Sequence, residues 1–158
     1  MRQNLGLQKQ LQTVKYPQTF QGNKNILGDV LYLLMLSDFH HHWKMHQVKR
    51  VIVPPMYHGQ YRIWYNNNDP FGFCLWAWVS DEILEKLLKE EYRMKADDWQ
   101  SGKNLYLAEF VAPFGQTRQI VRNMRQYIKE NFGADVKGHW FRPARKKVGT
   151  AMSGKKVA

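Results

Sequence analysis

The stretch that decides the fold covers residues 60–79 and reads QYRIWYNNNDPFGFCLWAWV. Its first part, residues 60–65, is rich in aromatic and β-branched side chains, which favours a β-strand. The run Asn-Asn-Asn-Asp-Pro at residues 66–70 is a strong turn signal. Residues 71–79 are too apolar for a strand with one face in water. The stretch therefore predicts a hairpin whose second strand is central in a sheet and covered on both faces.

Helix and strand patterns alternate downstream of this hairpin. Ser80 is a suitable helix N-cap, and acidic residues follow it in the first turn, where the helix dipole favours them. Such alternation is typical of a mixed sheet with helices packed on it. The downstream elements predicted in this way are a helix after Ser80, a strand over residues 104–111, an amphipathic helix over residues 116–132 and a last strand over residues 135–141.

Upstream of the hairpin, apolar residues repeat at helical spacing over residues 26–34, which predicts a helix. The polar run over residues 37–43 indicates a loop or a second short helix. Residues 48–53 are rich in β-branched side chains, so we expect a strand there that Pro54 and Pro55 stop.

The predicted fold class is α/β (α+β), with one mixed sheet of about five strands and helices on both faces. A chain of 158 residues suits one domain with one hydrophobic core, and we assign residues 26–141 to it. Residues 1–25 are polar and basic and are predicted to form an N-terminal arm. Residues 142–158 are predicted to form a basic C-terminal tail, because they contain few core-forming side chains.

The charge balance of the chain is strongly basic. There are 24 Lys and Arg against 13 Asp and Glu, a net charge of +11. This excess favours polyanionic partners, such as nucleic acid, an anionic membrane or an acidic protein, but it also fits a protein with a merely basic surface. The longest apolar run, residues 30–36, is far shorter than the roughly 18 residues of a membrane span, so no transmembrane segment is expected. The single cysteine fits a reducing compartment.

Glu109 is a candidate for chemistry because it lies inside a strand that is apolar on both faces. Period-two geometry places its side chain on the same face as Leu105, Leu107 and Val111. A carboxylate is costly to bury in such a place without a partner. Glu109 therefore either holds a catalytic base, or it pairs with an arginine or lies at a sheet edge.

Four histidines, His40, His41, His42 and His46, lie close together in the sequence. A histidine can exchange a proton near neutral pH. His42 and His46 have the i, i+4 spacing of some metal ligands, but this spacing alone is weakly specific, and we expect no metal. Cys74 lies in an apolar strand and is predicted to be a small buried hydrophobe rather than a nucleophile.

Several short motifs follow one another in a distinctive order. They are Ile26-Leu27-Gly28, then Ser37, His40 and Trp43, Pro54, Phe73-Cys74-x-Trp76-Ala77, Asp98-Trp99-x-Ser101-Gly102, Ala112-Pro113-Phe114-Gly115 and Met124-Arg125. With these motifs, over about residues 26–149, the chain resembles the toxin-activating lysine acyltransferases of the RTX cytolysins. The run from Ala112 to Gly115 is the most distinctive of them.

This resemblance implies a fold like that of the GNAT acetyltransferases. It implies a reaction that moves a fatty acyl group from acyl-carrier protein, the acyl donor, to internal lysines of a protoxin, with no bound cofactor. It also implies a cytoplasmic location and a tendency to form homodimers, and a basic surface suits acyl-carrier protein, which is acidic. The site residues implied by the resemblance are His40, Ser37 and Glu109 for catalysis, and Trp43, Pro113, Phe114 and Gly115 for substrate binding.

The chain departs from the family pattern at two positions, where Glu109 replaces an aspartate and Val51 replaces an asparagine. A second hypothesis is therefore a non-catalytic component that uses this fold for interaction. A net charge of +11 suits an assembly that contains nucleic acid, such as a virus particle. A third hypothesis is a small-molecule GNAT acetyltransferase, but the sequence has no G-x-G-x-x-G loop.

Overall fold

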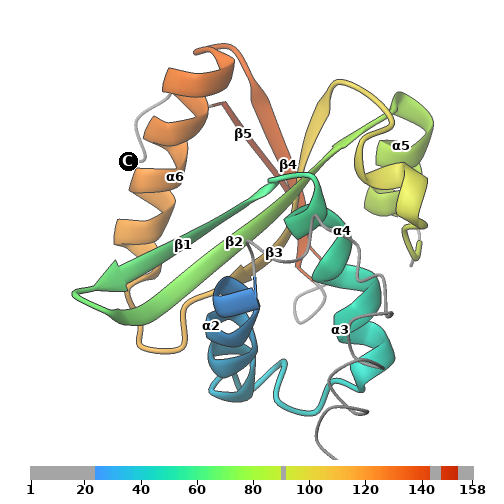
Figure 1. The fold of residues 1–158 in the computed structure, drawn as a ribbon. Helices are drawn as coiled ribbons and strands as arrows, with labels where there is room; N and C mark the ends of the chain where they lie inside the picture. The colour runs from blue at the N-terminus through green and yellow to red at the C-terminus, as the bar shows by residue number, and fades with distance from the viewer. Residues whose placement is uncertain (1–23, 90–91, 143–146, 153–158) are drawn as a thin grey trace, which may run out of the picture.

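A computed structural model describes residues 24–89, 92–142 and 147–152 (Figure 1). Its elements, in chain order, are α2 (Lys24–Met35), α3 (Met45–Val51), α4 (Val53–Tyr57), β1 (Tyr61–Asn66), β2 (Asp69–Val79), α5 (Asp81–Lys89), the 3₁₀ helix η2 (Ala96–Trp99), β3 (Asn104–Val111), α6 (Thr117–Phe132), β4 (Lys137–Arg142) and β5 (Lys147–Met152). The predicted mixed sheet of five strands with helices on both faces is confirmed.

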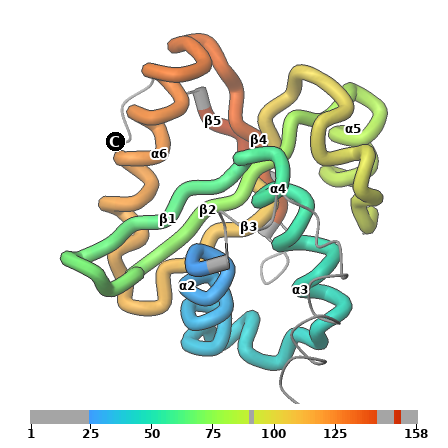
Figure 2. Tube along the Cα trace, in the orientation of Figure 1, coloured from blue at the N-terminus to red at the C-terminus, as the bar shows by residue number. Residues whose placement is uncertain are grey.

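The segment over residues 48–53 is helical, so the strand predicted there is wrong. α3 and α4 carry the chain from the loop after α2 into β1 (Figure 2). Three side chains at four-residue spacing are buried against β2, namely Val48, Ile52 and Met56. This helical spacing outweighs the β-branched content of the segment. Pro54 and Pro55 lie in the first turn of α4, where backbone N–H groups have no partner within the helix, so proline is tolerated.

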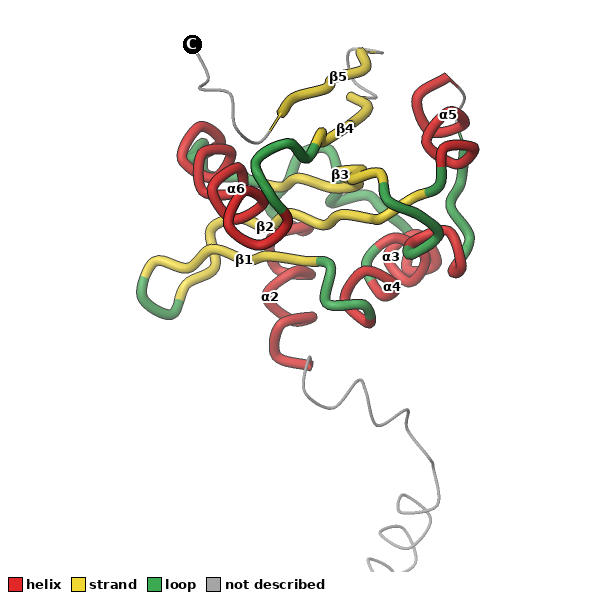
Figure 3. Tube along the Cα trace, turned by 90° about the horizontal axis from the view of Figure 1, so that it is seen from above, coloured by secondary structure: helices red, strands yellow, loops and turns green. Residues whose placement is uncertain are grey.

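The strands lie side by side in the order β1-β2-β3-β4-β5 (Figure 3). β1, β2 and β3 are antiparallel neighbours, β4 is parallel to β3, and β5 is antiparallel to β4. Within the described residues, β3 pairs with β4 only at its beginning, through Leu105 with Gly138 and Tyr106 with His139. Among the residues that the structure describes, the second half of β3 therefore has no strand partner on that side.

Strand β2 is covered on both faces, as predicted. Phe73 and Leu75 pack against α2, α3 and α4, whereas Cys74 and Trp76 pack against α6 on the opposite face. Further along the strand, Val79 packs with α5. In Figure 1, α6 lies above the β1–β2 hairpin, α2 lies below it, and α5 lies at the right.

A β-bulge in β3 decides which way Glu109 points. Leu107 lies opposite Trp76 and Glu109 lies opposite Leu75, so Ala108 is an extra residue between these two pairs. A bulge of this kind reverses the in–out alternation beyond it. Glu109 therefore faces α2, and the prediction that it shares a face with Leu107 is wrong.

The sheet continues into the segment that we expected to be a C-terminal tail. β5 pairs with β4 from Lys137 opposite Met152 to Arg142 opposite Lys147. This strand could not be predicted from the sequence, because small residues take the place of the usual alternation of apolar and polar residues. At Gly149, for example, a Cβ atom would overlap the Trp140 indole. The predicted arm falls almost wholly outside the described residues, as does the end of the predicted tail.

Candidate active site

The loop after α2 brings His40 to the sheet. The backbone N–H groups of His40 and His41 donate to the Ser37 carbonyl over 3.0 and 2.9 Å, and the Trp43 N–H donates to the His40 carbonyl over 2.9 Å. These turns fix the backbone without a helix. As a result, His40 is only 6% exposed, while the adjacent His41 is exposed to solvent.

Ser37, His40 and Glu109 form one hydrogen-bonded array. Ser37 Oγ lies 2.7 Å from His40 Nδ1, and Glu109 Oε2 lies 3.0 Å from His40 Nε2. The carboxylate is mostly buried, at 19% exposure. The structure thus joins three residues that the resemblance named; their catalytic roles remain predictions.

If His40 is neutral and Glu109 is ionised, the two contacts are compatible with one tautomer of the imidazole. An ionised carboxylate can only accept hydrogen bonds, so Nε2 of His40 carries the proton and donates it to Glu109. Nδ1 is then the unprotonated nitrogen, and the Ser37 hydroxyl donates to it. The basic nitrogen therefore faces a hydroxyl group, in the same order of hydroxyl, base and orienting carboxylate that activates nucleophiles in many enzymes.

Two aromatic rings contact His40, and exposed apolar side chains lie close to it in the sequence. The rings of Phe39 and Trp43 meet the His40 ring edge-on, with centroid distances of 4.9 and 4.8 Å. Trp43, which the resemblance names for substrate binding, thus contacts the His40 ring, and its role remains a prediction. Phe39 was missed, although its position next to His40 was a usable signal. Four apolar residues of this segment are 42–72% exposed, namely Met35, Leu36, Phe39 and Met45.

The loop between β3 and α6 holds the other predicted substrate-binding residues. Gly115 has φ of 87°, a left-handed conformation that favours glycine. Pro113 is half-buried, and Phe114 is 52% exposed. Phe114 lines a surface hollow of about 930 Å³, but His40 and Glu109 do not line it. This hollow is therefore separate from the array.

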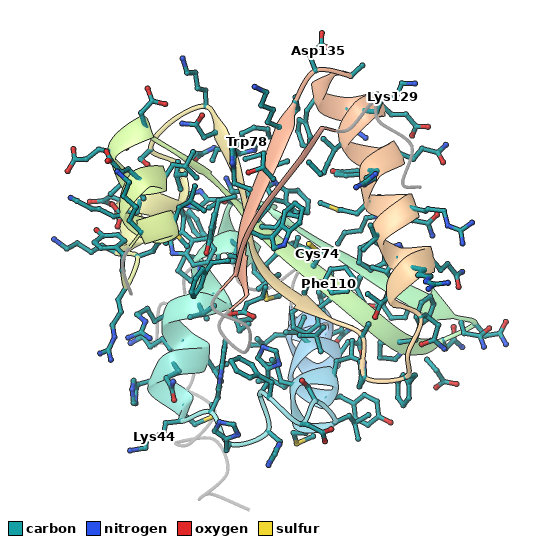
Figure 4. All side chains as sticks on the ribbon, turned by 180° about the vertical axis from the view of Figure 1, so that it is seen from behind. Lys44, Cys74, Trp78, Phe110, Lys129 and Asp135 are labelled. Carbon is teal, nitrogen blue, oxygen red and sulfur yellow. The ribbon has the colours of Figure 1, made fainter. Side chains whose placement is uncertain are left out.

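Cys74 is not suited to nucleophilic chemistry. Its side chain is fully buried, and burial, with a smaller contribution from Glu109, raises the pKa of the thiol to about 12. Figure 4 shows Cys74 beside Phe110, its cross-strand neighbour on the α6 side of the sheet. The predicted buried hydrophobe is confirmed. In the described part of the chain, no three His, Cys, Asp or Glu residues lie close enough to hold a metal ion.

The sheet, its helices and the histidine between a hydroxyl and a carboxylate define a GNAT-like α/β fold with a site suited to proton transfer. No helix among the described residues has the length and apolar character needed to cross a membrane. Residues 20–150 match the HlyC family of RTX toxin acyltransferases. Because this match covers most of the chain, the protein belongs to the RTX toxin acyltransferase family.

Individual relatives agree with this assignment. The chain is 26% identical over 125 residues to the RTX-II toxin-activating lysine-acyltransferase ApxIIC of Actinobacillus pleuropneumoniae, covering 79% of this chain and 76% of the relative. It is 29% identical over 106 residues to the lysine-acyltransferase RtxC of Vibrio cholerae, covering 66% and 69%. It is also 31% identical over 108 residues to the uncharacterized protein sll0720 of Synechocystis, covering 67% and 74%. The resemblance inferred from the motifs is confirmed.

Proposed function

We propose that this protein transfers a fatty acyl group from acyl-carrier protein to lysine side chains of a protein acceptor. The observation that carries the proposal is the Ser37–His40–Glu109 array, which supplies a buried base with an oriented proton. Membership of a family of lysine acyltransferases supports the reaction class. In this proposal His40 is the general base, Glu109 orients it, and Ser37 passes the proton to it.

The base is needed because a lysine amine is protonated at neutral pH, with an ordinary pKa of about 10.4. The ammonium group gives one proton to the Ser37 hydroxyl as that hydroxyl gives its own proton to His40 Nδ1. The freed amine attacks the thioester carbonyl, a C–N bond forms, and the C–S bond breaks. The leaving thiolate takes the first proton from His40. The second proton, which the amine loses as the amide forms, passes through Ser37 to the His40 that is neutral again and from there to solvent.

A direct transfer is favoured over an acyl-serine intermediate on chemical grounds. An oxygen ester is less reactive toward amines than the thioester that would be used to make it. If an acyl-serine formed first, the lysine amine would have to attack this less reactive oxygen ester instead of the thioester. The Ser37 hydroxyl is better used as a proton relay at 2.7 Å from the base.

The surroundings suit both substrates of this reaction. Met35, Leu36 and Phe39 are exposed apolar side chains within a few residues of Ser37 and His40 in the sequence, and such side chains suit an alkyl chain. Trp43 would hold the acyl group next to His40, and the Pro113–Gly115 loop would guide the substrates. The net charge of +11 favours association with acidic acyl-carrier protein. We place the reaction in the cytoplasm, in a homodimer, with residues 26–141 and β5 as the catalytic domain.

The test is acyl transfer from palmitoyl-acyl-carrier protein carrying an alkyne-tagged chain, with a lysate of the source cells as the pool of acceptors. We expect protein labelling that resists hydroxylamine, because an amide survives where thioesters and oxygen esters are cleaved. His40→Asn should abolish this labelling. His42→Asn, at an exposed histidine two residues away, should leave it unchanged. If wild-type protein produces no resistant label, the proposed function is wrong.

A further inference from the structure

The surface hollow of about 930 Å³ lies outside the array and has no part in the proposed chemistry. It forms where α2, the end of the β1–β2 hairpin and the N-terminal half of α6 meet, elements that Figure 1 shows around the turn of the hairpin. Its volume falls within the range of about 300–1,000 Å³ that is usual for ligand sites. Its lining therefore indicates what it could bind.

Two buried polar atoms belong to residues that line the hollow and have no hydrogen-bond partner. Trp64 is only 7% exposed, and its Nε1–H donor is unpartnered within the described part of the chain. The same is true of the acceptor Oε1 of Gln116. Buried polar groups are rarely left unpaired, because desolvation without a partner is costly. Both atoms have almost no solvent-accessible surface, so a ligand in the hollow would reach them only after the side chains beside them shift. A peptide unit carries both the carbonyl and the N–H group that would then pair with them.

The other lining residues also fit a polypeptide better than a lipid chain. Asn66, Gln119 and Asn123 add amide side chains, which would lose hydrogen bonds to water against an alkyl chain. Tyr32 and Tyr65 add exposed rings, at 46% and 43% exposure. Aromatic rings combined with amide side chains are typical of surfaces that bind polypeptides.

The charge of the hollow differs from that of the chain as a whole. Although the net charge of the protein is +11, the lining of the hollow, as far as the described residues form it, includes Asp69 but no lysine or arginine. Arg62 does not line the hollow, although its guanidinium carbon lies 5.9 Å from the centre of the Trp64 ring and 4.5 Å from the centre of the Tyr127 ring. The hollow therefore does not favour acidic acyl-carrier protein. It favours a neutral or cationic segment, such as one that carries a lysine.

We propose that this hollow docks the polypeptide segment around the target lysine, an inference that rests on the proposed function. Its position is compatible with that role. Tyr32 lines the hollow from the last turn of α2, and Ser37 follows it by five residues, two residues after the helix ends at Met35. A few extended residues of about 3.3 Å each would bring a lysine from the hollow to the hydroxyl of the array.

The test introduces a positive charge at one of two glutamines of α6. Gln119 lines the hollow, whereas Gln126 lies two turns further along, about 10 Å away, and does not line it; both are exposed. The probe is a short Gly/Ser peptide with one central lysine. Gln119→Lys should raise the KM for this peptide about three- to tenfold through like-charge repulsion, with the KM for palmitoyl-acyl-carrier protein unchanged. Gln126→Lys should change neither value.

A second readout does not need catalysis. In ¹⁵N-labelled protein with assigned indole signals, the peptide should shift the Trp64 Nε1–H resonance, and the same peptide with glutamate in place of lysine should shift it less. A Trp64 shift without acyl transfer would support the docking site and refute the proposed function. The docking proposal is refuted if millimolar peptide leaves Trp64 unshifted, if the two glutamine variants behave alike, or if Gln119→Lys changes the KM of the donor instead.

Discussion

Replacing Glu109 with glutamine separates the charge of this side chain from its size. In the wild-type array, the carboxylate accepts the Nε2 proton of His40 over 3.0 Å and leaves Nδ1 free to act as a base toward Ser37. A glutamine amide can instead present its NH₂ group. The imidazole would then carry its proton on Nδ1, and Ser37 would face a donor rather than a base.

The expected loss follows from the value of general base catalysis. A positioned base contributes about 10²–10⁴ in rate, so Glu109→Gln should lower kcat/KM by that factor, or about 2.7–5.4 kcal/mol. Glu109→Asp keeps the charge but withdraws the carboxylate by about one methylene. A misplacement of about 1 Å costs roughly a hundredfold, so this variant should also be impaired although aspartate is the residue implied by the family pattern.

Glu109→Gln should also lower the free energy of unfolding, separately from its effect on the rate. A hydrogen bond to a charged group contributes about 1.5–3 kcal/mol, and the bond here lies between a 6% exposed imidazole and a 19% exposed carboxylate. For a chain of this size each kcal/mol changes Tm by about 2–4 °C, so Tm should fall by about 3–12 °C.

The assay measures hydroxylamine-resistant transfer below the Tm of each variant, with thermal unfolding recorded in parallel. His42→Asn serves as the control for an exposed histidine of the same loop. If Glu109→Gln unfolds at lower temperature but retains activity within about threefold, the carboxylate stabilises the fold without orienting the base, and the assignment of Glu109 is wrong.

Three further predictions concern positions outside the array. Because Cys74 is buried and the pKa of its thiol is raised to about 12, iodoacetamide at pH 8 should alkylate it only in denaturant. Burial and a hydrogen bond to an aspartate of α2 raise the pKa of Tyr65 from about 10 to about 12. The stabilising contribution of Tyr65 is therefore complete below pH 10 and is lost as the pH rises from about 10 to about 12. The difference in the free energy of unfolding between wild type and Tyr65→Phe, measured in urea, should shrink over that range. Gly149→Val should place a side chain against the Trp140 indole and lower Tm, whereas Gly28→Ala, which meets no neighbouring atom, should raise it slightly.

The elements that could be predicted from the sequence are those with a strong local pattern. The asparagine-rich turn and the doubly apolar strand after it located the hairpin, and the helical period over residues 116–132 located α6. Residues 48–53 misled because β-branched content and helical spacing coincide in a short run, and burial of Ile52 and Met56 decided the outcome. β5 was missed because its sequence lacks apolar alternation. It pairs with β4 along its length, and the large Trp140 side chain of β4 fills the space over Gly149.

The residues of the site could be predicted from the sequence, but the contacts between them could not. The motif order indicated His40 and Glu109, residues that are 69 positions apart. Their contact depends on backbone details that composition does not reveal. One is the set of turns that follows Ser37, and the other is the register shift before Glu109.

The residues of β3 could pair with β2 in two ways, with the bulge at Ala108 or without it, and the two pairings differ by a shift of one residue beyond Leu107. In a regular ladder continued from Leu107, Ala108 would sit across from Leu75, and Glu109 would sit across from Cys74 and point toward α6. His40 would then have no contact with the Glu109 carboxylate, although every residue of the site would still be present. A substitution on β2 or β3 that removes the bulge should therefore abolish the proposed acyl transfer without touching any residue of the array, and a relative with a regular ladder can carry all the expected side chains and still be inactive.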